Sequence, residues 1–144
     1  MKVYELNVTH QIDAPLDKVF DFFSKPENLS EITPAKLGFN ILTPSPIKME
    51  KGTLIDYTIK LMGIPLRWRS LITDYDPPKK FVDEQLKGPY SYWHHTHTFK
   101  AVDKGVEMND VVREPSLDSH FTDSTKPARL YFDTKRFNDC FSIV

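Results

Sequence analysis

The stretch that decides the fold runs from residue 88 to residue 113 and reads G-P-Y-S-Y-W-H-H-T-H-T-F-K-A-V-D-K-G-V-E-M-N-D-V-V-R. Aromatic residues, threonine and valine are dense on both sides of a polar A-V-D-K-G break. Two such runs, joined by a short loop that contains glycine, are typical of a β-hairpin. The stretch therefore predicts two antiparallel strands.

The two predicted strands each have a face of unusual composition, because side chains alternate between the faces of a sheet. One face of the first run combines large apolar groups with imidazoles: Trp93, His95, His97 and Phe99. One face of the return run is apolar apart from a carboxylate: Val106, Met108, Asp110 and Val112. A purely structural sheet seldom needs this mixture, whereas the wall of a cavity can use it.

The chain before the hairpin predicts a strand, two short helices and four further strands. Residues 2–12 alternate as a strand, and residues 13–23 carry an apolar stripe at helical spacing, with Asp13 as the expected N-cap. Residues 26–31 are long enough for one or two more helical turns. The remaining runs with strand character are 37–43, 53–62, 66–75 and 79–86.

The chain after Pro115 predicts a terminal helix. Residues 127–144 carry Leu130, Phe137, Phe141 and Val144 at roughly helical spacing. The element order predicts an α+β fold, in which a curved antiparallel sheet of about seven strands is crossed on its concave face by a long C-terminal helix. One helix does not fill such a concavity, so we expect a cavity between helix and sheet.

Length and composition limit the remaining possibilities. A chain of 144 residues suits a single domain over 1–144, and a net charge of −1 argues against nucleic acid as a partner. The single cysteine, Cys140, cannot form an intramolecular disulfide and fits a reducing compartment. No run approaches the roughly 18 apolar residues of a membrane span, and the amino terminus lacks the apolar run of a signal peptide. We therefore expect a cytoplasmic protein.

Four segments of the chain together resemble one protein superfamily. They are I-D-A-P-L-D-K-V-F-D-F-F-S from residue 12, P-E-N-L-S-E-I-T-P from residue 26, D-Y-D-P-P-K-K-F-V-D-E-Q from residue 74, and the hairpin itself. Their order and spacing over residues 3–115 resemble the SRPBCC superfamily of START-like, or helix-grip, proteins, which includes birch-pollen-allergen-type proteins and polyketide cyclases. The resemblance implies a sheet wrapped around a long C-terminal helix. It ends at Pro115, because residues 116–126 lack the glycine-containing turn that precedes that helix in relatives.

The leading functional prediction is binding of a small hydrophobic or amphipathic molecule, lipid-like or polycyclic, between the sheet and the terminal helix. The expected lining residues are Tyr57, Ile59, Trp93, His95, His97 and Phe99. The alternative is an enzyme of the polyketide cyclase or dehydratase type, in which His95 or His97 moves a proton with help from Asp110. We expect no cofactor, since the chain has no glycine-rich phosphate loop. The absence of a G-x-S-x-G motif also argues against nucleophilic catalysis.

The histidine pair is open to three interpretations. His95 and His97 face the same way and are candidates for proton transfer or for anchoring a ligand. The simpler interpretation is that they are hydrogen-bonded within the sheet or stacked between Trp93 and Phe99. A metal site with Asp110 is the third, but no glutamate follows in the T-F-K-A segment, and a catalytic site needs three convergent ligands. We therefore predict no metal. Asp110 meets His97 only if the turn contains no bulge; otherwise it faces solvent.

Overall fold

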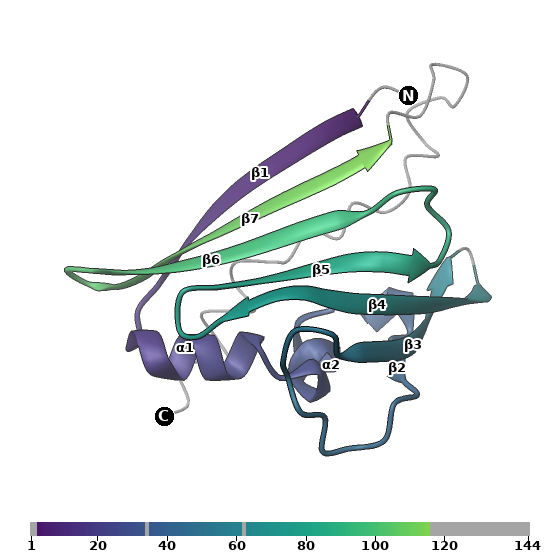
Figure 1. Ribbon diagram of the computed structural model, residues 1–144, viewed down its shortest axis with the longest axis horizontal. Coiled ribbons are helices and arrows are strands. Elements are labelled where there is room, and N and C mark those ends of the chain that lie inside the picture. Colours follow the sequence, from purple (N-terminus) through teal and green to yellow (C-terminus); the bar gives the residue numbers. More distant parts are fainter. Residues whose placement is uncertain (1–2, 34, 62, 116–144) are drawn as a thin grey trace.

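The computed structural model describes residues 3–33, 35–61 and 63–115, which form an antiparallel sheet with a few short helices (Figure 1). Seven strands pair in the order β1-β7-β6-β5-β4-β3-β2. The strands are β1 (Val3–Ile12), β2 (Asn40–Ile41), β3 (Leu54–Leu61), β4 (Ile64–Asp76), β5 (Lys80–Lys87), β6 (His94–Val102) and β7 (Gly105–Pro115). The helices are α1 (Leu16–Phe23) and α2 (Leu29–Ile32), with 3-10 turns η1 (Pro26–Asn28) and η2 (Ala35–Leu37).

The predicted hairpin and its two faces are confirmed. Strands β6 and β7 pair in a register without a bulge, from His94 opposite Arg113 to Val102 opposite Gly105. Alternate residues are buried, as predicted: Trp93, His95, His97, Phe99, Val106, Met108, Asp110 and Val112. The first strand of the hairpin, β6, begins at His94, so residues 88–93 precede it. The side chain of Trp93 nevertheless points to the inner face of the sheet.

Helix α1 forms from the predicted apolar stripe, but its start differs from the prediction. Val19, Phe20 and Phe23 are buried, and α1 packs on β6 and β7. The N-cap is Pro15, with extended backbone, and not Asp13. A residue that precedes proline disfavours the helical conformation, so the helix begins only after Pro15. The acidic Asp17 in the first turn favours the positive end of the helix.

Two other predicted elements have different outcomes. The strand expected over residues 37–43 is reduced to Asn40–Ile41, and Ala35–Leu37 forms a 3-10 turn instead. The terminal helix expected over residues 127–144 lies outside the described residues. The two short helices after the first strand are present as α1 and α2.

The inner face of the sheet carries two groups of buried apolar side chains. The first, here called the helix-covered core, consists of Ile12, Val19, Phe20, Phe23, Ile32, Phe81, Phe99, Val106 and Met108. The second, here called the aromatic cluster, consists of Ile59, Trp68, Trp93 and Val112, with Leu6, Phe39, Tyr57 and Tyr90 packed against it. Helix α1 contributes to the first group only.

Gly105 lets the β6–β7 turn lie against the end of β1. Its φ of +124° is a conformation that other residues rarely adopt. A Cβ atom at this position would collide with the carbonyl oxygen of Ile12 and approach the Cα atom of Asp13. The close approach therefore needs glycine on both grounds.

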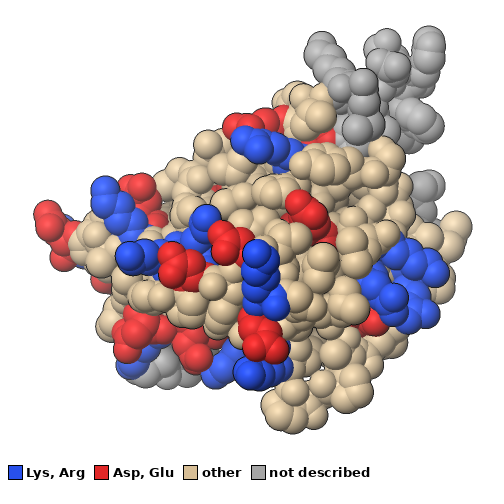
Figure 2. Space-filling view, in the orientation of Figure 1, with Lys and Arg blue, Asp and Glu red and all other residues tan. Residues whose placement is uncertain are grey.

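The visible surface mixes charges of both signs. Figure 2 shows Lys and Arg side chains interspersed with Asp and Glu over most of this face, with a small basic group at its right edge. Arg69 donates two hydrogen bonds of 2.8 and 3.2 Å to Asp56 across the outer face of β3 and β4. No helix in the described part of the chain is long and apolar enough to cross a bilayer.

Candidate functional site

A pocket of about 100 Å³ lies between the inner face of strands β3 to β7 and the segment that carries α1 and α2. Most of its lining is apolar, and the helical side contributes Phe23, Pro26, Leu29 and Ile32. The sheet side contributes Ile55, Ile59, Trp68, Ile72, Phe81, Trp93 and Met108. Polar side chains reach the pocket at only a few places, and these decide what it can do.

Five of the six predicted lining residues do line this pocket: Tyr57, Ile59, Trp93, His95 and His97. Phe99 is not among the lining residues: its ring packs in the helix-covered core, with its centre 5.2 Å from that of Phe20. Helix α1 covers the end of β6 that carries Phe99. The alternation along the strand shows that Phe99 faces inward, but it does not show which part of the inner face the helix covers.

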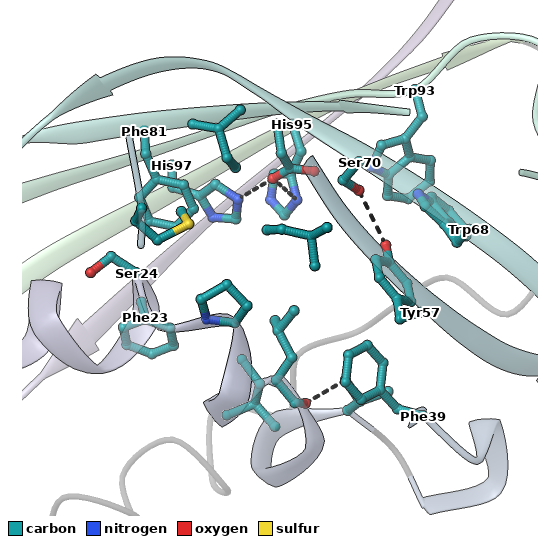
Figure 3. A pocket seen from close by; sticks show the side chains of 18 of the residues that line it. Phe23, Ser24, Phe39, Tyr57, Trp68, Ser70, Phe81, Trp93, His95 and His97 are labelled. Carbon is teal, nitrogen blue, oxygen red and sulfur yellow. Dashed lines mark hydrogen bonds and ion pairs between the residues drawn. The ribbon is translucent and has the colours of Figure 1, made fainter. Parts of the chain in front are cut away.

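Four polar residues gather on the inner face, and we call them the polar cluster: Asp83, His95, His97 and Asp110. The imidazoles of His95 and His97 lie side by side, with ring centres 3.7 Å apart. Figure 3 shows the two imidazoles between Phe81 on one side and Trp68 and Trp93 on the other. The polar cluster therefore separates the helix-covered core from the aromatic cluster.

Each imidazole of the polar cluster lies between two carboxylates. His97 places Nε2 at 2.8 Å from Oδ2 of Asp83 and Nδ1 at 2.8 Å from Oδ1 of Asp110. His95 places Nε2 at 3.1 Å from the same Oδ1 and Nδ1 at 3.9 Å from Oδ2 of Asp83. The His97 contact with Asp110 is an ion pair by distance, although its direction is out of line for a hydrogen bond.

Asp110 lies deepest in the polar cluster. It is 3% exposed, and the register places it opposite His97, as predicted for a turn without a bulge. Its Oδ2 atom lies 3.6 Å from Nε2 of His10 and has no hydrogen-bond partner among the described residues. A buried carboxylate of this kind is stable only beside positive charge or hydrogen-bond donors. The surrounding imidazoles supply both.

The electrostatics of the polar cluster favour ionised carboxylates. Burial by itself would lower the pKa of His97, but Asp110 and Asp83 outweigh burial and raise that pKa to about 9. Burial would raise the pKa of Asp110, yet His95 and His97 hold it well below its usual range. Burial likewise opposes ionisation of Asp83, and the hydrogen bond from His97 lowers its pKa. In this arrangement the polar cluster contains two carboxylates and the His97 imidazolium.

A second polar group lies on β3 and β4. The hydroxyl groups of Tyr57 and Ser70 are 3.4 Å apart, and both residues line the pocket. Burial raises the pKa of Tyr57, so this phenol stays protonated and can donate a hydrogen bond. Trp68 beside it is 2% exposed, and its Nε1 has no hydrogen-bond partner in the described parts of the chain.

Sequence reasoning missed Asp83 and His10. Asp83 is opposite His95 in the β5–β6 ladder, and His10 is opposite Met108 on β7. The signal for Asp83 was present, because it lies two residues after the inward-facing Phe81 on a strand next to the histidines. Using that signal requires the register between β5 and β6, which the segment 88–93 obscures. With Asp83 included, three possible metal ligands lie together: Asp83, His95 and His97.

Comparisons with known proteins identify the fold. No family model matches the chain, and neither does any curated protein. A solved structure from Rhodobacter sphaeroides matches with a TM-score of 0.70 at 13% identity, over 97% of this chain and 93% of that one. One from Chromobacterium violaceum matches with a TM-score of 0.64 at 15% identity, over 78% and 81%.

A third solved structure, Ara h 8.0201, has a TM-score of 0.62 at 16% identity, and the match covers 85% of each chain. Ara h 8.0201 is a Bet v 1-like protein with a helix-grip fold. The seven-stranded sheet and short helices of this chain are compatible with that fold, as the sequence resemblance implied. Matches at sequence identities this low are evidence for a shared fold but not for a shared activity.

Proposed function

We propose that the pocket binds a small hydrophobic or amphipathic molecule, with the apolar part against Trp68, Trp93 and Ile59. The observation that carries this proposal is a mainly apolar pocket with few polar groups: three members of the polar cluster, the Tyr57–Ser70 pair, and Ser24 and Thr33 on the helical side. Pockets that bind small molecules commonly combine apolar walls with a few placed polar groups. The polar end of an amphipathic guest would lie beside Asp83 and His97.

The size of the pocket limits the guest. Its volume of about 100 Å³ is below the roughly 300 Å³ at the low end for ligand pockets. A single ring that buries about 150 Å² of apolar area gains roughly 4 kcal/mol, before the entropy cost of association. A lipid-like or polycyclic guest has to widen the pocket or to keep part of its length outside. Such a guest buries more apolar area and therefore gains more binding free energy.

The likeness to Ara h 8.0201 supports a helix-grip arrangement in which a C-terminal helix forms part of the pocket wall. In this chain the predicted helix over 127–144 would take that place, within a single domain over residues 1–144. The cytoplasmic location expected from the lone Cys140 stays a prediction.

Tryptophan fluorescence tests the proposal directly. The chain has two tryptophans, and both line the pocket. A brominated fatty acid or a brominated polycyclic hydrocarbon bound there should quench their emission with a saturable, one-to-one dependence on concentration. Non-brominated forms should reverse the quenching by competition. Quenching that stays linear and equals that of free tryptophan would contradict the proposal.

A pair of matched variants locates the binding. Ile59→Phe places extra volume in the pocket, whereas Leu54→Phe adds the same ring on the opposite face of β3, where Leu54 is 45% exposed. Ile59→Phe should lower the affinity measured by saturable quenching at least tenfold, and Leu54→Phe should leave that affinity unchanged. Equal effects of both variants would place the binding elsewhere.

A reaction of the polyketide cyclase type is the alternative, because the imidazoles of His95 and His97 reach the pocket wall. Such an enzyme needs a shaped pocket and one or two acid–base groups. His97→Gln would then lower turnover of a polyketone while leaving its affinity close to normal. Binding without turnover by the unaltered protein favours the leading proposal.

A further inference from the structure

We propose that Asp83, His95 and His97 bind a divalent first-row transition metal ion at the sheet side of the pocket. The three side chains each offer one ligand atom, and these atoms all lie within 4.8 Å of one another. Two imidazoles and one carboxylate form a donor set that suits such ions as zinc, cobalt and iron(II). This inference is independent of the apolar guest, because the ligands belong to the protein alone.

The distances between the ligand atoms are close to those that a metal requires. Bonds of roughly 2.1 Å in a tetrahedral site place neighbouring ligand atoms about 3.4 Å apart. Oδ2 of Asp83 lies 2.8 Å from Nε2 of His97 and 3.9 Å from Nδ1 of His95. One of these distances is shorter and the other longer than that value, so a shift of the Asp83 carboxylate by less than 1 Å would adjust both.

Asp110 occupies the position that supports metal-binding histidines. Metal-binding imidazoles almost always direct their other nitrogen to a carboxylate, a carbonyl or water, which fixes the ring and its tautomer. Oδ1 of Asp110 lies 3.1 Å from Nε2 of His95 and 2.8 Å from Nδ1 of His97. One buried carboxylate therefore hydrogen-bonds the outer nitrogen of His95 and lies beside that of His97, which leaves Nδ1 of His95 and Nε2 of His97 on the side of Asp83.

The charge of the site also fits a divalent cation. Asp83 and Asp110 bring two carboxylates into a region where Asp110 is 3% exposed. A single imidazolium would balance only one of these two charges. A divalent ion bound by two neutral imidazoles balances both carboxylates.

The metal would face the pocket. All three proposed ligands line it, whereas Asp110 does not. Three protein ligands leave at least one coordination position open, and that position would point toward the guest. An oxygen atom of an amphipathic guest is the chemical group best suited to occupy it.

Cobalt(II) is the probe for this site, because its visible absorption reports ligand number and geometry. Titration of the full chain, freed of metal by a chelator, should show one equivalent bound with d–d bands of a four- or five-coordinate nitrogen and oxygen site. X-ray absorption at the metal edge should count two imidazoles. Zinc should displace cobalt, and manganese should bind more weakly than either. No stoichiometric binding, or a six-coordinate hydrated spectrum, would overturn the proposal.

Matched variants separate this site from metal bound at the surface. His94 lies on the outer face of β6 with Nε2 at 3.6 Å from Oε1 of Glu84, so it is an outward copy of a histidine–carboxylate pair on the same two strands. His94→Gln should leave cobalt affinity unchanged. Asp110→Asn should weaken it about 10–100-fold, the usual effect of losing a supporting carboxylate.

Loss of a direct ligand should have the larger effect. His95→Gln and Asp83→Asn should each weaken binding more than Asp110→Asn does, and should change the d–d spectrum. Circular dichroism and urea unfolding of each variant establish that it is folded. If a folded His95→Gln variant keeps the affinity and spectrum of the unaltered protein, the proposed ligands are wrong.

Discussion

The two ends of the inner face of the sheet are both rich in aromatic rings, yet α1 contributes to only one of them. In the helix-covered core, Phe20 of α1 contacts Phe81 and Phe99, with ring centres 6.0 and 5.2 Å away. In the aromatic cluster, which contains no residue of α1, the ring centres of Trp68 and Trp93 are 5.4 Å apart. The pocket borders both groups, since Phe81 lines it as well as the two tryptophans. The difference is the cover that α1 provides and not the content of aromatic residues.

Strand β6 passes through both ends and shows where the change occurs. Trp93, directly before its first residue, belongs to the aromatic cluster, and Phe99 on its inward face belongs to the helix-covered core, with the two histidines between them. Strand β7 repeats the pattern, since Asp110 lies between Val112 and Met108. The polar cluster is thus the boundary between the helix-covered core and the aromatic cluster.

The largest effect on the free energy of unfolding is expected from a cavity in the helix-covered core. Phe20→Ala removes a ring that is 4% exposed, and such deletions usually cost about 3–5 kcal/mol. Urea unfolding monitored by circular dichroism measures the change in the free energy of unfolding. A loss below about 1 kcal/mol would mean that the helix-covered core is packed no more tightly than the aromatic cluster.

The boundary itself should be the next most sensitive place. Asp110→Asn keeps the shape but removes a charge that contacts His95 and His97, and lost hydrogen bonds to charged groups typically cost roughly 1.5–3 kcal/mol. Urea unfolding at neutral pH in the presence of a chelator measures this cost without a contribution from metal. A variant as stable as the parent protein would show that the polar cluster contributes no net stability.

A substitution in the aromatic cluster should cost less than either. Trp68→Phe shortens a buried ring that borders the pocket, and it removes an Nε1 donor that has no partner in the described residues. Relief of this unpaired donor offsets part of the lost contact, so we expect a loss of about 1 kcal/mol in the free energy of unfolding. The same urea experiment measures it. A loss as large as that of Phe20→Ala would remove the distinction between the two ends.

The smallest effect concerns the loop beside the pocket and depends on pH. Oε1 of Glu27 accepts hydrogen bonds from the backbone N–H of Ile47 and the hydroxyl of Ser45, at 2.8 and 3.0 Å. Burial opposes ionisation, but these bonds lower the pKa of Glu27. Because the folded pKa lies below the unfolded one, the stabilisation is present above about pH 4.3 and is lost as the pH falls through the folded pKa.

Glu27→Gln should therefore lower the free energy of unfolding by roughly 0.5–1 kcal/mol at pH 7 and by nothing measurable near pH 2. Unfolding curves of the two proteins across this pH range provide the test. A difference that grows as the pH falls would contradict the assigned sign.

Local periodicity accounts for what could be predicted. The inward face of β6, the turn at Gly105 and the apolar stripe of α1 each depend on residues close together in sequence. Two features could not be predicted in this way. The place of Asp83 beside His97 depends on the register between β5 and β6, and β4 carries an irregularity between Ile72 and Asp74 that shifts its own pairing with β5. The packing of Phe99 depends on how far α1 reaches along the sheet.

The turn at Gly105 has a mechanical consequence for the pocket. Ile12 and Asp13, which the turn touches, are followed within three residues by Leu16, the first residue of α1. Any side chain at position 105 would push on this joint, and the displacement would be transmitted along the rigid helix to Phe23 and Ser24 at its far end, where both line the pocket. The shape of the pocket therefore depends on the turn at Gly105, although neither Gly105 nor the two residues that it touches line the pocket.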